Sequence, residues 1–143
     1  MLSGIDPLLT GELLHHLDAM GHSDAVVLAD AHFPAQRLAT RLVSLPGCTV
    51  PEVLRAVRTV LPLDVSPALD LMGAADGRRL PVHDELLAAV GDEADEPRFL
   101  SREDFYWAAT TAYLVVRTGE TRAYGNALVR KGLVPTDAGR SQG

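Results

Sequence analysis

The sequence predicts an α/β protein in which helices cover both faces of a mostly parallel sheet, giving three α/β/α layers. Apolar residues recur at spacings of three and four in several segments, which is typical of amphipathic helices. Short apolar runs of strand length separate these segments, the clearest being Ala25–Ala29 between two aspartates. Strands that alternate with helices favour a parallel sheet, and a continuously apolar strand indicates burial on both faces.

Local signals place the individual elements. Helices are expected over residues 8–20, 51–61, 82–90 and 105–111, and strands over 25–29, 69–73, 98–100, 112–117 and 127–130. Gly21 is a typical residue after a helix end, and Thr49 and Ser101 are typical N-cap residues. Residues 35–47 are compatible with a helix or with an edge strand, and the pattern does not choose between them.

The chain has 143 residues, which predicts one domain, residues 1–135, followed by a polar C-terminal tail, residues 136–143. The net charge is −6 and the arginines are scattered, so we expect no nucleic-acid partner. The longest apolar stretches are too short to span a bilayer, so we expect no membrane association. Cys48 is the only cysteine, which suits a reducing compartment, and we expect a cytoplasmic protein.

Two candidate functional residues flank the first strand. His22 follows the glycine that ends the first helix, and it is either a solvated loop histidine or a general acid/base, since imidazole titrates near neutral pH. Asp30 follows the strand directly, and its carboxylate either caps the next turn or anchors a ligand. The residue types and their positions leave both alternatives open.

Three further candidates lie later in the chain. Arg102 enters the first turn of a helix and is either a surface arginine or a fork-shaped donor to ligand oxygens. Tyr124 and Asn126 flank a glycine, in a segment that is either a plain turn or a ligand-binding loop. We expect no cofactor, because phosphate-binding and common hydrolase motifs are missing from the sequence. A metal site is not expected either; one built across subunits from His22, Asp30 or His32 is a weaker alternative.

Taken together, these clusters resemble the RbsD/FucU family, and its fucose mutarotase branch more than its ribose pyranase branch. The similarity covers about residues 4–135 in family order. The matching segments are Met20-Gly21-His22, Ala29-Asp30-Ala31-His32-Phe33-Pro34, Arg102 with Phe105-Tyr106, Thr118-Gly119-Glu120, Tyr124-Gly125-Asn126 and Lys131-Gly132. The chain departs from the fucose branch at Trp107-Ala108-Ala109, where that branch usually carries a charged segment.

The resemblance implies an RbsD-like fold and a sugar mutarotase that interconverts the α and β anomers of a monosaccharide, with L-fucose as the best candidate. It implies that His22 is the proton donor and that Asp30, Arg102, Tyr124 and Asn126 bind the sugar. It also implies a homo-oligomeric ring, typically a decamer, with the sugar sites between subunits. A non-catalytic sugar-binding protein that serves sugar transport is the alternative function.

The distance between His22 and Asp30 adds a constraint of its own. They are eight residues apart, and an extended chain rises about 3.3 Å per residue, so a straight strand would separate them by roughly 25 Å. That distance exceeds the size of one monosaccharide. A turn at Ser23-Asp24 would shorten the distance somewhat; otherwise the site takes His22 from one subunit and Asp30 from another, or one of the two residues is not in the pocket. Of these alternatives we favour the site shared between subunits.

Overall fold

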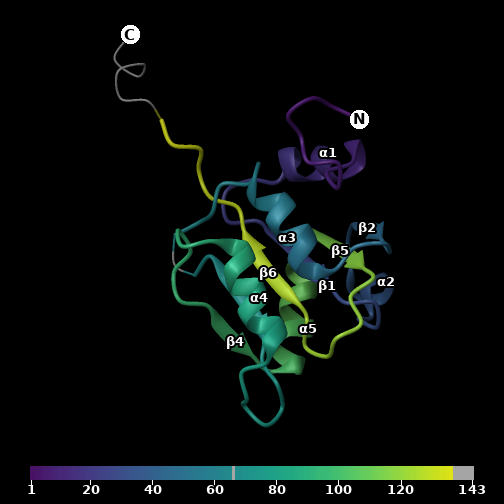
Figure 1. The fold of residues 1–143 in the computed structure, drawn as a ribbon, viewed down its shortest axis with the longest axis vertical. Helices are drawn as coiled ribbons and strands as arrows, with labels where there is room; N and C mark the ends of the chain where they lie inside the picture. The colour runs from purple at the N-terminus through teal and green to yellow at the C-terminus, as the bar shows by residue number, and fades with distance from the viewer. Residues whose placement is uncertain (66, 137–143) are drawn as a thin grey trace.

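The computed structural model describes residues 1–65 and 67–136, and these form a three-layer α/β/α domain, as the sequence predicts (Figure 1). The helices are α1 (Gly11–Ala19), α2 (Ala35–Leu38), α3 (Val50–Arg58), α4 (Pro81–Val90) and α5 (Arg102–Thr111). The strands are β1 (Ala25–Ala29), β2 (Leu42–Leu45), β3 (Leu69–Met72), β4 (Arg98–Leu100), β5 (Leu114–Thr118) and β6 (Ala127–Arg130). No helix among the described residues is long and apolar enough to cross a membrane.

The sheet has the strand order β2-β5-β1-β6-β3-β4. The pairs β2–β5, β5–β1 and β3–β4 are parallel, and only β6 runs antiparallel to its neighbours β1 and β3. The prediction of a mostly parallel sheet is thus confirmed. As a consequence, the carboxyl ends of β1, β2, β3, β4 and β5 lie at the same edge of the sheet as the start of β6. We call this edge the carboxyl edge and the opposite one the amino edge.

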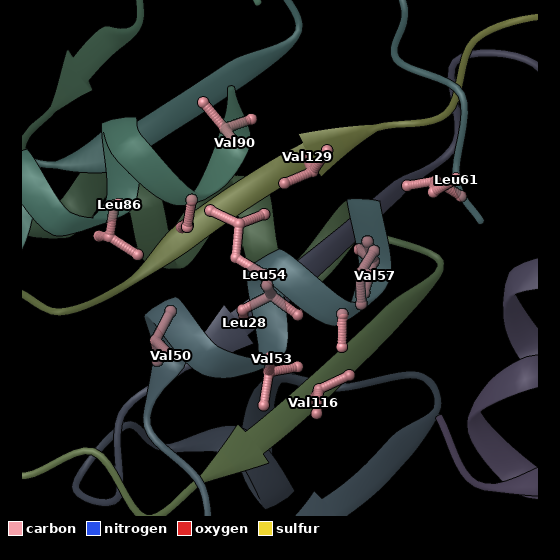
Figure 2. Close-up of a cluster of buried hydrophobic side chains, with 14 of the residues drawn as sticks. Leu28, Val50, Val53, Leu54, Val57, Leu61, Leu86, Val90, Val116 and Val129 are labelled. Atoms are coloured by element: carbon pink, nitrogen blue, oxygen red, sulfur yellow. The ribbon is translucent and has the colours of Figure 1, made fainter. Parts of the chain in front are cut away.

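Two apolar cores fix the layers. Helices α3 and α4 pack on one face of the sheet, where Leu54 of α3 and Val90 of α4 lie beside Val129 of β6 in one buried cluster (Figure 2). Helices α2 and α5 cover the other face, where Phe105 of α5 packs edge-on against Phe33. Because β1 contributes Val26 and Leu28 to one core and Val27 and Ala29 to the other, it is buried on both faces.

The expected N-cap residues Thr49 and Ser101 were confirmed, and α5 begins at Arg102, directly after its cap and earlier than the expected residue 105. The Thr49 hydroxyl accepts a hydrogen bond from the Glu52 amide (3.3 Å), and the Ser101 hydroxyl accepts one from the Asp104 amide (3.1 Å). The first helix begins later than predicted, because Thr10 is its N-cap and the apolar residues at 8 and 9 pack from the preceding turn instead. Helix α3 ends at Arg58 rather than at 61.

Residues 35–47, left open by the sequence, contain both alternatives in turn. Helix α2 makes one turn over Ala35–Leu38, and β2 follows at the outer edge of the sheet. A four-residue helix and a four-residue edge strand are too short to impose a period on the sequence. In the expected tail, residue 136 is exposed and has no regular structure, and residues 137–143 lie outside the described part of the chain.

Candidate functional site

Four of the five predicted site residues lie at the carboxyl edge of the sheet. Asp30 follows β1, Arg102 follows β4, and Tyr124 and Asn126 precede β6. His22 precedes β1 and therefore lies at the amino edge. Since β1 alone spans five residues, or about 17 Å, one chain does not bring His22 and Asp30 into one monosaccharide site.

Asp30 and Asn126 form a buried pair at the carboxyl edge. The Asp30 amide donates to Oδ1 of Asn126 (2.7 Å), and Nδ2 of Asn126 donates to Oδ2 of Asp30 (2.9 Å). The other carboxylate oxygen of Asp30 accepts a hydrogen bond from the His32 amide (2.9 Å), so the aspartate does cap the turn that follows β1. Each carboxylate oxygen keeps acceptor capacity for a further donor, such as a sugar hydroxyl.

Arg102 and Tyr124 line one cleft at the same edge of the sheet, whose lining does not include Asp30 or Asn126. The cleft has a volume of about 420 Å³, and its remaining lining comes from Gly73, Ala74, Ala75, Ser101 and Glu103. Arg102 is exposed in the first turn of α5, so its guanidinium is free to reach ligand oxygens, while Tyr124 is half-buried. Tyr124 has a backbone φ of +63°. Residues other than glycine rarely adopt this left-handed conformation, and where they do it often marks a functional site.

The loop after β5 supports the carboxyl edge through Glu120, which sequence reasoning quoted but gave no role. The Glu120 carbonyl accepts a hydrogen bond from the Ala31 amide (2.8 Å), which ties this loop to the turn after Asp30. Burial raises the pKa of the Glu120 carboxyl, but hydrogen bonds from the Arg122 guanidinium and backbone outweigh it and hold that pKa below its usual value. The carboxylate therefore stays charged and keeps the loop ordered near neutral pH.

At the amino edge, His22 contacts a residue that the sequence analysis missed. Nε2 of His22 lies 3.2 Å from Oδ1 of Asp64, and the Ser23 hydroxyl donates to Oδ2 of the same carboxylate (2.9 Å). The side chain of Asp64 is 11% exposed and that of His22 is 52% exposed. Asp64 lies in a loop 42 residues after His22, and no pattern in the sequence links a single loop aspartate to a histidine so far away.

The contacts of Asp64 also set its charge. Burial raises its pKa, but hydrogen bonds from the Ser23 hydroxyl, the Val65 amide and His22 together hold the pKa below its usual value. Asp64 is therefore an anion at neutral pH, oriented toward one nitrogen of an exposed imidazole. Such an arrangement orients the ring through Nε2, and Nδ1 has no hydrogen-bond partner among the described residues and can take part in a proton transfer.

The Lys131-Gly132 segment explains how the His22 loop is held in place. Nζ of Lys131 donates to the carbonyls of Leu17 (2.7 Å), Asp18 (3.2 Å) and Met20 (2.7 Å), which caps the end of α1. A Cβ atom at Gly132 would lie 2.0 Å from the carbonyl oxygen of Leu63, so only glycine permits this close approach next to Asp64.

The aromatic residues that follow Arg102 on α5, and the possible metal ligands, were the remaining candidates from the sequence. Phe105 is fully buried and Tyr106 half-buried, and both contact the Phe33 ring edge-on, so they belong to the core. Trp107 is 73% exposed on α5. Within the described residues, no three His, Cys, Asp or Glu side chains of one chain are grouped so as to hold a metal ion.

The α/β/α fold with this strand order defines a known class of proteins, and comparison with known proteins identifies the class. Residues 3–134 match the RbsD / FucU transport protein family. The chain therefore belongs to the RbsD/FucU family.

Its relatives include proteins named as fucose mutarotases. The chain is 39% identical to the L-fucose mutarotase of Haemophilus influenzae, over 94% of this chain and 99% of that protein. It is 36% identical to the fucose mutarotase of Danio rerio, over 96% and 97% of the two chains. The crystal structure of the fucose mutarotase of Streptococcus pneumoniae in complex with L-fucose superposes with a TM-score of 0.87 at 33% identity, covering 94% of this chain and all of that one.

Proposed function

We propose that this protein is a sugar mutarotase that interconverts the α and β anomers of a monosaccharide, with L-fucose as its substrate. The observation that carries the proposal is the carboxyl-edge site. Asp30 and Asn126 form a buried hydrogen-bonded pair at the same sheet edge as a cleft lined by Arg102 and Tyr124, in a chain that matches L-fucose mutarotases along nearly its full length. These four residues offer charged, amide and phenol groups for sugar hydroxyls, and the tyrosine ring offers an apolar face.

His22 is the proposed general acid/base. In ring opening, His22 donates a proton to the ring oxygen as the bond between that oxygen and the anomeric carbon breaks. The anomeric hydroxyl loses its own proton to solvent, which restores the proton balance. The resulting aldehyde turns and recloses by the reverse steps on its other face, so no net proton, electron or group is consumed. A positioned imidazole contributes roughly 10²–10⁴-fold to such proton transfers.

The separation of His22 from Asp30 supports a site shared between subunits. His22 precedes β1 and Asp30 follows it, so a sugar held at the carboxyl edge of one chain needs a histidine from the amino edge of a neighbour. The proposal therefore includes a homo-oligomeric ring, a decamer by family resemblance. It also includes a cytoplasmic location, which suits a chain with a single cysteine.

Saturation-transfer NMR tests the enzymatic claim directly. Added protein is expected to accelerate exchange between the α and β anomers of L-fucose, with D-ribose and D-galactose measured beside it. His22→Ala is expected to abolish the acceleration while leaving saturable sugar binding. Unchanged exchange with the wild-type protein would refute the mutarotase proposal, and full activity in His22→Ala would refute the role of His22.

A complementation experiment tests the shared site. His22→Ala and Asp30→Ala chains are each expected to be inactive as pure oligomers. When equal amounts are dissociated and reassembled together, random mixing gives about a quarter of the sites an intact histidine and an intact aspartate. Recovery of activity supports the shared site, whereas a mixed oligomer with no activity would place both residues in the same chain's site.

A non-catalytic sugar-binding protein is the second candidate function. The separation of His22 from Asp30 favours it for a single chain that is not part of an oligomer. The carboxyl edge of one chain holds the sugar-binding groups without His22. Under this alternative, the protein binds L-fucose saturably and leaves the rate of anomer exchange unchanged. The NMR experiment above separates the two functions.

A further inference from the structure

His83 is a buried histidine in the first turn of α4 that the proposed mechanism does not use. Its side chain is fully buried, and its ring packs edge-on against Phe99 at a centroid distance of 5.3 Å. Nδ1 accepts a hydrogen bond from the Leu80 amide (3.0 Å), and Nε2 lies 2.9 Å from the carbonyl oxygen of Met72. A backbone amide can only donate, so Nδ1 carries no proton and the Nε2 proton is donated to Met72.

These two partners are the two ends of one loop. Met72 is the last residue of β3 and Leu80 is the N-cap of α4, so the imidazole joins both ends of the loop formed by residues 73–80. In Figure 1 this loop projects from the molecule below α4. It forms one wall of the cleft that contains Arg102 and Tyr124, and of an adjoining hollow of about 240 Å³ that also contacts Tyr124.

Met72 also connects His83 to the Asp30–Asn126 pair. The Met72 amide donates to the Asn126 carbonyl (3.3 Å), and Nδ2 of Asn126 lies 3.8 Å from the Met72 sulfur. The same Nδ2 holds the Asp30 carboxylate. The residue whose carbonyl is fixed by His83 is therefore in direct contact with the asparagine that orients the sugar-binding aspartate.

From this geometry we infer that His83 is a positioning residue for the sugar site. It holds the 73–80 loop and Met72 in place through one neutral imidazole with its proton on Nε2. The inference rests on the proposed function, because it names what shapes the sugar cleft. It also makes a specific kinetic prediction. The neighbouring subunit supplies the His22 of this site, so disturbing His83 alters the groups of its own chain that bind the sugar and leaves the proton-transferring histidine itself unchanged.

Three variants separate a positioning role from a general loss of stability. His83→Phe keeps a ring for packing against Phe99 but removes both hydrogen bonds. His83→Gln keeps one acceptor and one donor, and glutamine at this third helical position is a natural partner for the N-cap amide. Val90→Ala lies in the same helix, is buried and apolar, and does not line the cleft, so it serves as the matched control for lost packing.

The expected result is a split between binding and turnover, measured by saturation-transfer NMR over a series of L-fucose concentrations. His83→Phe raises the half-saturating concentration several-fold and changes the maximal exchange rate by less than twofold. His83→Gln restores the wild-type value, and Val90→Ala leaves it unchanged. An unchanged half-saturating concentration in His83→Phe, or the same increase in Val90→Ala, would overturn the inference.

Two measurements without turnover keep the inference testable if His83→Phe fails to fold. The ¹⁵N chemical shifts of His83 in the wild-type protein are expected to show the neutral form protonated at Nε2, and a proton on Nδ1 would overturn the assignment. Hydrogen exchange across residues 73–80 is expected to be faster in His83→Phe or, if that variant does not fold, in His83→Ala than in His83→Gln. If the wild-type protein does not accelerate anomer exchange, the proposed function is refuted. The ¹⁵N shifts of His83 and the hydrogen exchange of residues 73–80 still test whether His83 holds the loop.

Discussion

Replacing Asn126 by aspartate puts a second carboxyl group against Asp30 in a buried site. Asn126 is 1% exposed, and its Nδ2 lies 2.9 Å from Oδ2 of Asp30. Asn126→Asp exchanges that donor for an oxygen of the same charge as its neighbour. The side chains are nearly isosteric, so packing against Met72 is preserved and the charge is the main change.

The size of the effect follows from the distance. Two unit charges about 3.5 Å apart at an effective dielectric constant near 20 repel by about 5 kcal/mol. One carboxyl of the pair will therefore bind a proton more tightly than a free carboxyl does, so the repulsion raises its pKa in the folded state. At pH 7 the variant is expected to lose about 4 kcal/mol of unfolding free energy, because the folded state must either keep most of this repulsion or bind a proton that the unfolded state does not hold.

The sign of the pH dependence distinguishes this mechanism from simple loss of a hydrogen bond. A carboxyl whose pKa is raised in the folded state binds its proton more tightly there, so acidification stabilises the folded variant. Lowering the pH from 7 to 5.5 is expected to recover about 2 kcal/mol, because the unfolded carboxyl still has its usual pKa near 4. The protonated group can then donate to Asp30 as the asparagine does.

Urea unfolding at the two pH values, at a fixed protein concentration, measures the difference. Asn126→Leu is the matched control, because it removes both hydrogen bonds to Asp30 without adding a titrating group. Its loss of stability, relative to the wild type, is expected to be the same at pH 7 and pH 5.5. If Asn126→Asp shows no recovery at pH 5.5, or loses no more stability than Asn126→Leu at pH 7, the buried pair does not exist as described.

Three further predictions test the other interactions. Asp64→Asn removes the anion beside His22 and is expected to lower the maximal anomer-exchange rate. The loss is at most the roughly 10²–10⁴-fold that a positioned proton-transfer group contributes, and sugar affinity, measured by NMR titration, is expected to stay unchanged. An unchanged exchange rate would contradict a role for Asp64 in orienting His22. Gly132→Ala sets a methyl group 2.0 Å from the Leu63 carbonyl oxygen and is expected to cost about 1–3 kcal/mol in urea unfolding, and an unchanged midpoint would show that no such approach exists. For Asp70, burial raises the pKa but hydrogen bonds from two arginines hold it below its usual value near 3.8, so its stabilising contribution is present above about pH 4 and is lost as the pH falls further. Asp70→Asn should therefore show a flatter loss of stability below pH 4 than the wild type in acid titration followed by circular dichroism, and parallel curves would argue against the ion pairs.

Much of the fold could be predicted because its signals are local. The apolar run Ala25–Ala29 matches β1 at both ends, and the N-cap residues Thr49 and Ser101 stand where their helices begin. A helix cap or a buried strand is specified by neighbours within a few residues, so the amino-acid pattern carries the information. The short elements in residues 35–47 lack such a period, and no local pattern resolves them.

The sequence predicted which polar residues stand at the candidate site, but not the contacts between residues that are far apart in the chain, because no local pattern specifies them. Asp30 and Asn126 were expected in one site, and the structure joins them through two hydrogen bonds across 96 residues of chain. That the histidine stands at the other edge of the sheet follows once Ala25–Ala29 is a strand, and the eight-residue spacing already required it.

The sequence by itself determined the α/β class, the family and most of the polar residues at the two edges of the sheet. Only the tertiary structure decided that β6 runs antiparallel between β1 and β3, which carries Asn126 to the Asp30 edge and Lys131 to the His22 edge. It also decided that Asp64 contacts His22 and that His83 joins both ends of the 73–80 loop. These contacts depend on which chain segments pack together, and the free energy that selects them comes from burying the shared core rather than from any pattern near the residues themselves.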